Sequence, residues 1–218
     1  LNQVLLVFSY HPARKSRQPK KPSIASKTEW HAAWKYFTQE LPHQKPPYSR
    51  RNWGHPLHSL CSYQGKMKPS LAAYLVKTFL QKPSKVLDPF AGVGTIPFEA
   101  ALQGHQTYGF EISLAAYVIA SAKLGSPDRQ TCEKVIVDLA HFLETEKASN
   151  EEVVLAATFG FNGKLSDYYH EKTLREILLA RRFFNERPPK NTAEYLVMAS
   201  LLHILHGNRP YALSRRSH

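Results

Sequence analysis

The chain has 218 residues, of which 43% are hydrophobic and 21% charged, an ordinary balance for a globular protein with a buried core. No apolar run approaches the roughly 18 residues that a membrane-spanning helix needs. The stretch Val4–Phe8 is too short for the core of a signal peptide. Two cysteines, Cys61 and Cys132, make neither a disulfide framework nor a zinc site. These features argue against a membrane protein, a secreted disulfide-rich protein and a zinc finger, and they predict a cytoplasmic protein.

The net charge of +12 is unevenly distributed along the chain. Residues 1–85 contain 15 Lys and Arg against Glu29 and Glu40, a net charge of +13, whereas residues 86–218 carry −1. Such an excess favours a nucleic-acid partner, because each cation that neutralises a phosphate releases condensed counterions. The alternative is a solvated basic tail without a fixed partner. The candidate contact residues are Arg14, Lys15, Arg17, Lys20, Lys21, Arg50 and Arg51.

The N-terminal part alternates between irregular and helical patterns. Residues 12–27 are rich in Pro, Ser and basic residues and predict a flexible arm. A short helix is expected over residues 28–40, with Thr28 as its N-cap. Its apolar stripe consists of Trp30, Ala33, Trp34 and Phe37. The stripe favours packing over a platform for stacked bases, although both remain open. Prolines exclude a long helix over residues 41–58, and a second helix is expected over residues 69–80.

The pattern then changes to strands and helices in alternation. A short apolar strand is expected at residues 85–88, followed by a Gly-containing turn and a helix at residues 96–103. A second strand is expected at residues 106–110 and a further helix at residues 114–124. This order predicts a βαβ unit, which normally has parallel strands and a right-handed crossover.

The rest of the chain shows mostly helical periodicity. Helices are expected at about residues 128–146, 169–185 and 192–205. Residues 153–161 stay ambiguous between strand and helix, because a short apolar run does not decide the period.

The most informative stretch is Val86–Thr95, VLDPFAGVGT. It places Asp88 at the carboxyl end of the first strand, where open α/β sheets bind ligands. Gly92 and Gly94 allow a tight turn that a ligand can approach closely. Glu111 follows the second strand 23 residues later, at a distance that suits a carboxylate bound to a ribose diol. A phosphate-binding loop fits poorly, since there is no nearby Lys and Asp88 would repel a pyrophosphate. A Gly turn without a ligand is the remaining alternative.

At these residues the sequence resembles the S-adenosylmethionine-dependent DNA amino-methyltransferases, which methylate cytosine N4 or adenine N6. DPFAGVGT is similar to their first cofactor motif, and Glu111 to their ribose-binding acid. Tyr63–Pro69 (YQGKMKP) resembles the loop that closes over the methionine end of the cofactor. Residues 167–183 and 203–207 resemble the helical insertion of one bacterial branch.

The resemblance implies an α/β fold of the Rossmann-like class I methyltransferase type, incomplete, with a basic arm and a helical insertion. It divides the chain into a basic arm and short helix at residues 1–58, a cofactor-binding βαβ core at 59–127 and a mainly helical segment at 128–218. The cofactor would be S-adenosyl-L-methionine. Its implied contacts are Tyr63, Lys66, Asp88, Phe90, Gly92, Gly94, Thr95, Glu111 and Ile112.

The resemblance also implies a role for each contact. Phe90 would pack near the sulfonium, Ile112 would lie on the adenine, and Glu111 would bind both ribose hydroxyls. Lys66 would assist at the carboxylate end. The methionine and its amino group would be lined by Asp88, Gly92, Gly94 and Thr95. The alternatives are core packing for the two apolar side chains, a solvated charge for Lys66 and a surface salt bridge for Glu111.

The family's catalytic motif, Asp/Asn/Ser-Pro-Pro-Tyr/Phe, has no good counterpart here. In the family its first side chain and the next carbonyl hold the exocyclic amine, while an aromatic ring stacks on the flipped base. Lys45–Tyr48 (KPPY) offers a donor where an acceptor is needed, and Arg187–Lys190 (RPPK) has neither acceptor nor ring. We expect KPPY to be a loop and assign no catalytic residue.

The complete sheet of this family has more strands than the two or three that the sequence predicts. The chain also begins with Leu and ends before the place where the catalytic motif would follow in the branch it resembles. Three interpretations are open: a truncated or frame-interrupted methyltransferase, one half of a split enzyme, or a cofactor-binding module without chemistry. In each we expect weak catalysis alone, and an apolar strand edge that binds a complementary chain or limits stability.

The expected function is the cofactor-binding part of a site-specific DNA methyltransferase of restriction–modification type. One alternative is a guanosine-N2 RNA methyltransferase, which has a similar first motif. The other is a non-catalytic subunit that binds cofactor or DNA and completes a partner. No metal site is expected, since neither His55 with His58 nor His203 with His206 has a Cys or carboxylate at metal-ligand spacing.

Overall fold

The computed structural model describes residues 5–12, 26–50, 53–80, 83–156 and 168–207. The chain forms two compact units, residues 1–126 and 127–218.

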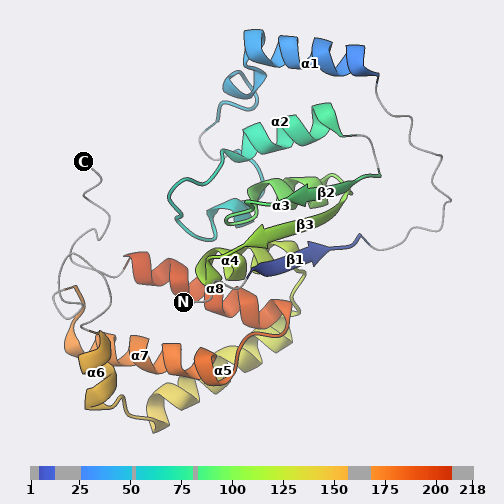
Figure 1. Cartoon of the computed structure of the whole chain (residues 1–218). Coiled ribbons are helices and arrows are strands. Elements are labelled where there is room, and N and C mark those ends of the chain that lie inside the picture. The colour runs from blue at the N-terminus through green and yellow to red at the C-terminus, as the bar shows by residue number, and fades with distance from the viewer. Residues whose placement is uncertain (1–4, 13–25, 51–52, 81–82, 157–167, 208–218) are drawn as a thin grey trace. The chain divides into compact units, whose positions relative to one another are not determined.

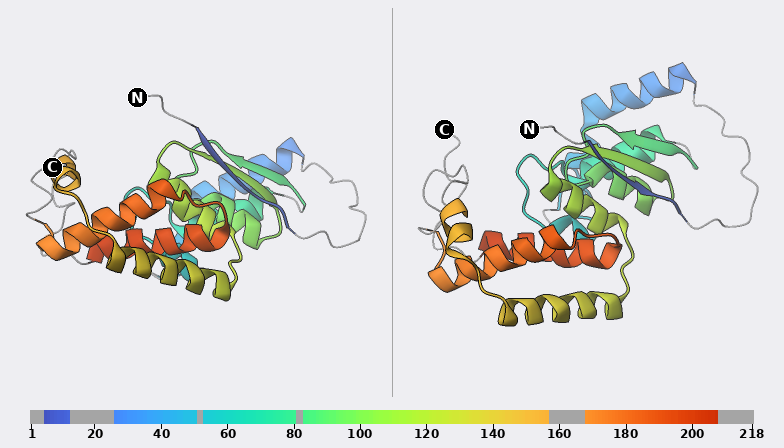
Figure 2. Two further views of the ribbon diagram at one scale, coloured as in Figure 1. Left: turned by 90° about the horizontal axis from the view of Figure 1, so that it is seen from below. Right: turned by 60° about the horizontal axis from the view of Figure 1, so that its bottom comes forward.

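The first unit is built on a three-stranded mixed sheet, in the order β1-β3-β2 (Figures 1 and 2). β2 (Lys85–Asp88) and β3 (Gln106–Glu111) are parallel, as the βαβ pattern predicts. β1 (Leu6–Tyr10) pairs antiparallel with the other side of β3. The fold is therefore α/β with a small mixed sheet.

β1 was not predicted from the sequence. Its signal is the alternation of Leu6, Phe8 and Tyr10, which are buried or half-buried, with the exposed Val7 and Ser9. Phe8 lies opposite Gly109 in the register, and its buried ring occupies the place where a Cβ on Gly109 would stand. The Phe8 side chain of β1 thus fills the space that the missing side chain of Gly109 leaves on β3.

Four helices belong to this unit: α1 (Lys27–Glu40), α2 (Pro69–Phe79), α3 (Thr95–Leu102) and α4 (Leu114–Leu124). They agree with the predicted helices to within one residue at each end. The predicted N-cap Thr28 was wrong, because the N-cap is Ser26. Its hydroxyl accepts from the Glu29 N–H at 3.2 Å and its own N–H donates to the Glu29 carboxylate at 2.6 Å. This reciprocal capping box fixes the start of α1.

The aromatic stripe of α1 faces α2 in part. Phe37 stacks on Tyr74 with ring centroids 5.8 Å apart, and Trp34 contacts Phe79 at 6.2 Å. Trp30 and Trp34 nevertheless remain about half exposed, and α1 buries none of its residues completely. The segment after α1 contains two short 3₁₀ turns, Pro42–Gln44 and Pro56–Ser59. This agrees with the prediction that the prolines exclude a long helix from this segment.

The second unit is helical. It contains α5 (Arg129–Thr145), α6 (Asn150–Ala156), α7 (Glu171–Glu186) and α8 (Thr192–Gly207). Leu139, Phe183, Phe184 and Val197 form one buried cluster of this unit. The ambiguous segment 153–161 is helical up to Ala156, and residues 157–161 lie outside the described part. Among the described helices, none is long and apolar enough to cross a membrane.

Candidate functional site

The turn between β2 and α3 has a conformation that its glycines permit. Gly92 and Gly94 have φ of 51° and 71°, in the left-handed region that favours glycine. The Gly94 N–H donates to the Ala91 carbonyl at 2.8 Å, which closes the turn just before α3 begins. A Cβ on Gly94 would lie 2.8 Å from the Ala120 Cβ of α4, so helix packing also requires glycine there.

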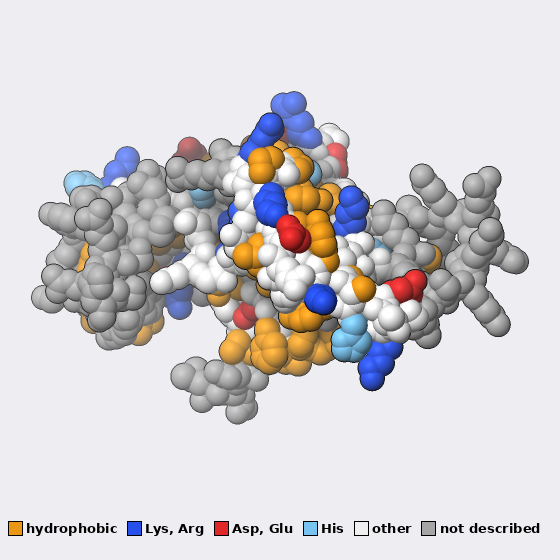
Figure 3. All heavy atoms as spheres, turned by 90° about the horizontal axis from the view of Figure 1, so that it is seen from above, with side chains coloured by type: hydrophobic (Ala, Val, Ile, Leu, Met, Phe, Trp, Pro, Cys, Tyr) orange, Lys and Arg blue, Asp and Glu red, His pale blue; other side chains and the backbone are white. Residues whose placement is uncertain are grey.

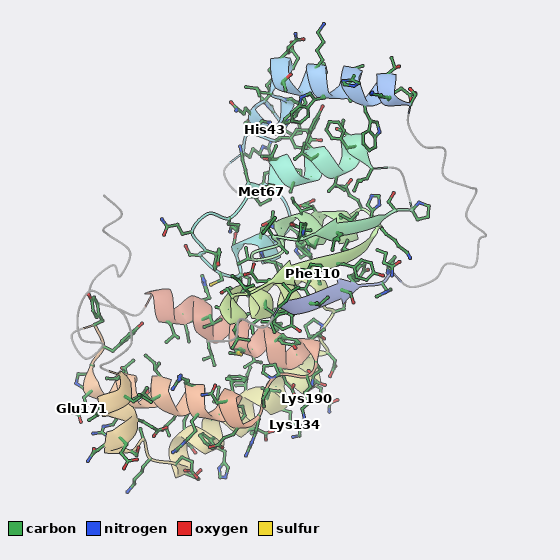
Figure 4. The ribbon with its side chains drawn as sticks, viewed as in Figure 1. His43, Met67, Phe110, Lys134, Glu171 and Lys190 are labelled. Atoms are coloured by element: carbon green, nitrogen blue, oxygen red, sulfur yellow. The ribbon has the colours of Figure 1, made fainter. Side chains whose placement is uncertain are left out.

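A cavity of about 290 Å³ lies between this turn and the loop before α2. It is lined by Tyr63, Gly65, Lys66, Met67, Asp88, Phe90, Ala91, Gly92, Val93, Thr95 and Ile96. Met67, labelled in Figure 4, marks the loop side of the cavity. The fold therefore brings together two segments that the sequence analysis singled out separately. The lining also contains residues that were not among the predicted contacts, namely Gly65, Met67, Ala91, Val93 and Ile96.

Asp88 is the acidic group of this cavity. Its carboxylate accepts a hydrogen bond from the Phe90 N–H at 3.0 Å. Burial raises the pKa of Asp88, and the negative charge of Glu111 raises it further, while the Phe90 hydrogen bond acts in the opposite direction. The ionised carboxylate is therefore held in an unfavourable place, which a cationic ligand group would improve.

Three predicted contacts do not line the cavity: Gly94, Glu111 and Ile112. Glu111 ends β3, and its carboxylate accepts from the N–H groups of Ile112 at 2.8 Å and Ser113 at 2.7 Å. This fixes the carboxylate at the carboxyl end of the sheet, near enough to raise the pKa of Asp88. The side chain of Ile112 is exposed.

The loop side of the cavity is anchored by polar contacts that sequence patterns did not reveal. The half-buried Lys66 donates from Nζ to the His58 carbonyl at 2.7 Å. The ring of His58 lies 2.6 Å from a Glu99 carboxylate oxygen, and both side chains are buried. Because Glu99 belongs to α3, the pair ties the loop before α2 to the helix that follows the turn.

Phe90 lies at the mouth of the cavity and is 91% exposed. An aromatic ring that lies in solvent beside a cavity has a large apolar surface that no other group covers. It is therefore available for contact with a ligand, and the alternative of core packing does not describe this position.

Most of the candidate nucleic-acid contacts cannot be placed. Arg14, Lys15, Arg17, Lys20, Lys21 and Arg51 lie outside the described residues, while Arg50 is exposed. Figure 3, viewed from the α1 side, shows Lys and Arg side chains among hydrophobic ones on this face.

The two sequences considered for a catalytic motif occupy connections between helices. Lys45 forms an ion pair with Glu40 at 2.7 Å, and Tyr48 packs on Trp53 with ring centroids 5.3 Å apart. Arg187, at the end of α7, lies 5.0 Å above the ring of Phe183. Neither segment contributes to the cavity lining. Within the described ranges, no three His, Cys, Asp or Glu side chains gather into a group that could hold a metal ion.

Comparison with known proteins shows what the sequence around this cavity is similar to. Residues 58–162 match the model of the RMKL-like methyltransferase domain. This chain carries a methyltransferase domain. The type II methyltransferase M.MjaII of Methanocaldococcus jannaschii is 26% identical over 159 residues, which cover 64% of this chain. The match spans 30% of the length of that relative. No solved structure matches the chain.

The matched methyltransferase domain contains both sides of the cavity, from the His58 anchor through β2, α3 and β3. It is distantly related to a type II methyltransferase. The basic segment before residue 58 lies outside the match to the domain model.

Proposed function

We propose that the chain is the S-adenosylmethionine-binding part of a DNA methyltransferase that acts on an exocyclic amine of cytosine or adenine. The observation that supports this most directly is the cavity at the end of β2, where Asp88 lies beside the Gly92 turn within a methyltransferase domain. The finer fold assignment, a Rossmann-like class I methyltransferase, belongs to the same proposal.

The residues present suit this cofactor. The Asp88 carboxylate has a raised pKa and gains from a cation, and the amino group of the cofactor is one. Glu111 is fixed at the end of the neighbouring strand, as a diol-binding acid should be, and Phe90 offers an exposed ring. The sulfonium of the bound cofactor supplies an activated methyl group. The protein's own contribution is to orient it and to exclude water from the methionine end.

DNA is the proposed substrate because the first 85 residues carry a net charge of +13 and the relative from M. jannaschii is named as a type II methyltransferase. A restriction–modification role follows from the same likeness. The cytoplasm is the proposed location, which agrees with Cys61 and Cys132 being free thiols.

A complementary chain is part of the proposal. Within the described residues, β2 has a strand partner on one side only. Leu87 of this strand is 57% exposed. An apolar groove of about 350 Å³ adjoins the strand, lined by Trp34, Leu75, Val76, Phe79, Leu80, Val86 and Ile96. An unpaired strand edge beside an apolar groove is suited to receive another strand. We propose that the segment with the catalytic motif binds there.

Transfer of a labelled methyl group tests the proposed function. The chain alone should give no transfer, and addition of a complementary chain with the catalytic motif should produce labelled cytosine N4 or adenine N6 in DNA. A Leu87→Lys variant should lose this complementation, whereas Val137→Lys, a similarly exposed apolar position in α5, should retain it. Labelling of guanosine in RNA instead would favour the RNA methyltransferase alternative. Robust transfer by the chain alone would show that no partner is needed.

A further inference from the structure

Helix α4 lies directly behind the turn that forms one wall of the cavity. Its Ala120 occupies the space beside Gly94, and Lys123, one helical turn later, reaches the backbone of the same turn. Lys123 Nζ donates a hydrogen bond of 2.8 Å to the carbonyl oxygen of Val93, a residue of the cavity lining. Two adjacent contacts from one helix thus hold the turn that lines the cavity.

Lys123 is an unusual residue for this place. Its side chain is 2% exposed, and it is the only charged residue of α4, whose sequence is LAAYVIASAKL. Burial lowers the pKa of Lys123 to about 8, the positive charge of Lys66 adds to this, and Cys61 acts in the opposite direction. A buried ammonium lowers the stability of a fold. A buried lysine that contacts the turn beside the cavity therefore points to a role of Lys123 in the cavity.

The surroundings of Lys123 contain few other titratable groups. Its side chain lines a cavity of about 310 Å³. β1 contributes Tyr10 to this cavity, and the loop before α2 contributes His55. α3 supplies only apolar residues to that lining, among them Phe98. Lys66 and Cys61, from the same loop, act on its charge. Its hydrogen bond to Val93 is therefore the specific polar contact that a change of Lys123 would remove.

We infer that Lys123 is a positioning residue for the cofactor, which holds the Val93 carbonyl and with it the turn from Ala91 to Thr95 in the conformation that lines the cavity. This inference depends on the proposed function, because it takes the cavity to be the S-adenosylmethionine site. An ammonium donates a stronger hydrogen bond than a neutral amine. The contribution of Lys123 to cofactor affinity should therefore decrease as its proton is lost.

The test is the dissociation constant of S-adenosylmethionine for the full chain, measured by calorimetry at pH 7 and pH 9. Lys123→Met keeps the length of the side chain and removes the hydrogen bond. At pH 7 it should weaken binding roughly tenfold, the size expected for one charge-assisted hydrogen bond. At pH 9 the ratio of variant to wild-type dissociation constants should be several-fold smaller. The ratio cancels the titration of the cofactor itself, which is common to both proteins.

Ser121→Ala is the matched control, because Ser121 is a buried position of the same helix whose hydroxyl has no hydrogen-bond partner. It should bind like the wild type at both pH values.

If Lys123→Met does not fold, Lys123→Gln replaces it, with a smaller loss of affinity at pH 7 and the same decrease of the ratio of dissociation constants toward pH 9. Equal affinities at pH 7, or a ratio independent of pH, would overturn the inference while the proposed function stands. No binding by the wild type at either pH would overturn both.

Discussion

The His58 ring and the Glu99 carboxylate form a pair at 2.6 Å in which both side chains are almost completely buried. Removal of one partner from such a pair leaves the other polar group unsatisfied in the interior, which costs about 1 to 3 kcal/mol, and more for a charged group. We expect Glu99→Ala and His58→Ala each to lower the free energy of unfolding by an amount of this size. The double variant should lose clearly less than the sum, as urea unfolding would show. Additive losses would mean that the two side chains do not interact.

The Gly94 turn should tolerate no side chain. Gly94→Ala places a Cβ at 2.8 Å from the Ala120 Cβ and requires φ of 71° from an alanine. Gly104→Ala is the matched control, with φ of 85° but open space around the new Cβ. The free energy of unfolding of the control should decrease only by the cost of a positive φ for alanine, which is about 1 kcal/mol. Thermal unfolding should show a larger loss for Gly94→Ala, part of which Ala120→Gly restores. Equal losses for the two alanine variants would contradict the close packing of α4 on the turn.

The stability of the fold should depend on pH through Lys123. Its pKa of about 8 in the folded protein lies below the ordinary value of 10.5, so the unfolded chain binds more protons between these values. The contribution of Lys123 to stability is therefore fully present above pH 10.5 and is lost as the pH falls through 8.

Thermal unfolding of the wild type and Lys123→Met across this range measures the effect. The stability of the wild type relative to the variant should increase from pH 8 to pH 10.5. A constant difference between the two proteins would show that the pKa of Lys123 is not lowered by burial.

The basic arm should account for most of the salt dependence of DNA binding. Each phosphate contact contributes about 0.9 to the slope of log affinity against log salt concentration. Replacement of Arg14, Lys15, Arg17, Lys20 and Lys21 by alanine should therefore reduce the slope by several units, measured by fluorescence anisotropy with duplex DNA. The control replaces five exposed lysines and arginines of the second unit, namely Arg129, Lys134, Lys147, Lys172 and Lys190. Equal effects of both sets would indicate non-specific attraction without a defined basic interface.

The βαβ unit was predictable from the sequence because its signals are local. Apolar runs define β2 and β3, and glycine marks the turn before α3. β1 left a local signal in its alternation, but that signal was short and was not used; its partner was not predictable, since Leu6 pairs with Glu111 about 100 residues away. The start of α1 was misplaced because Thr28 and Ser26 are both good N-caps, and only the reciprocal contact with Glu29 decides between them.

The site was predictable to a similar degree. The glycine motif led to Asp88 and the turn, which line the cavity. The His58–Glu99 pair was not predictable, because it joins positions 41 residues apart through tertiary packing. Lys123 did leave a signal, as a lone charge within an apolar helix, which indicates either a helix end in solvent or a buried cation.

Calorimetry with S-adenosylmethionine on the wild type and on Asp88→Asn shows whether the cavity beside Asp88 binds this cofactor. Burial and Glu111 raise the pKa of Asp88, so its charge costs stability at neutral pH, and the amide should not lower the melting temperature. We expect one binding site in the wild type and an affinity at least about tenfold lower in Asp88→Asn, because the variant lacks a charged hydrogen-bond partner. No binding by the wild type, even with a complementary chain present, or unchanged affinity in a folded Asp88→Asn, would contradict it.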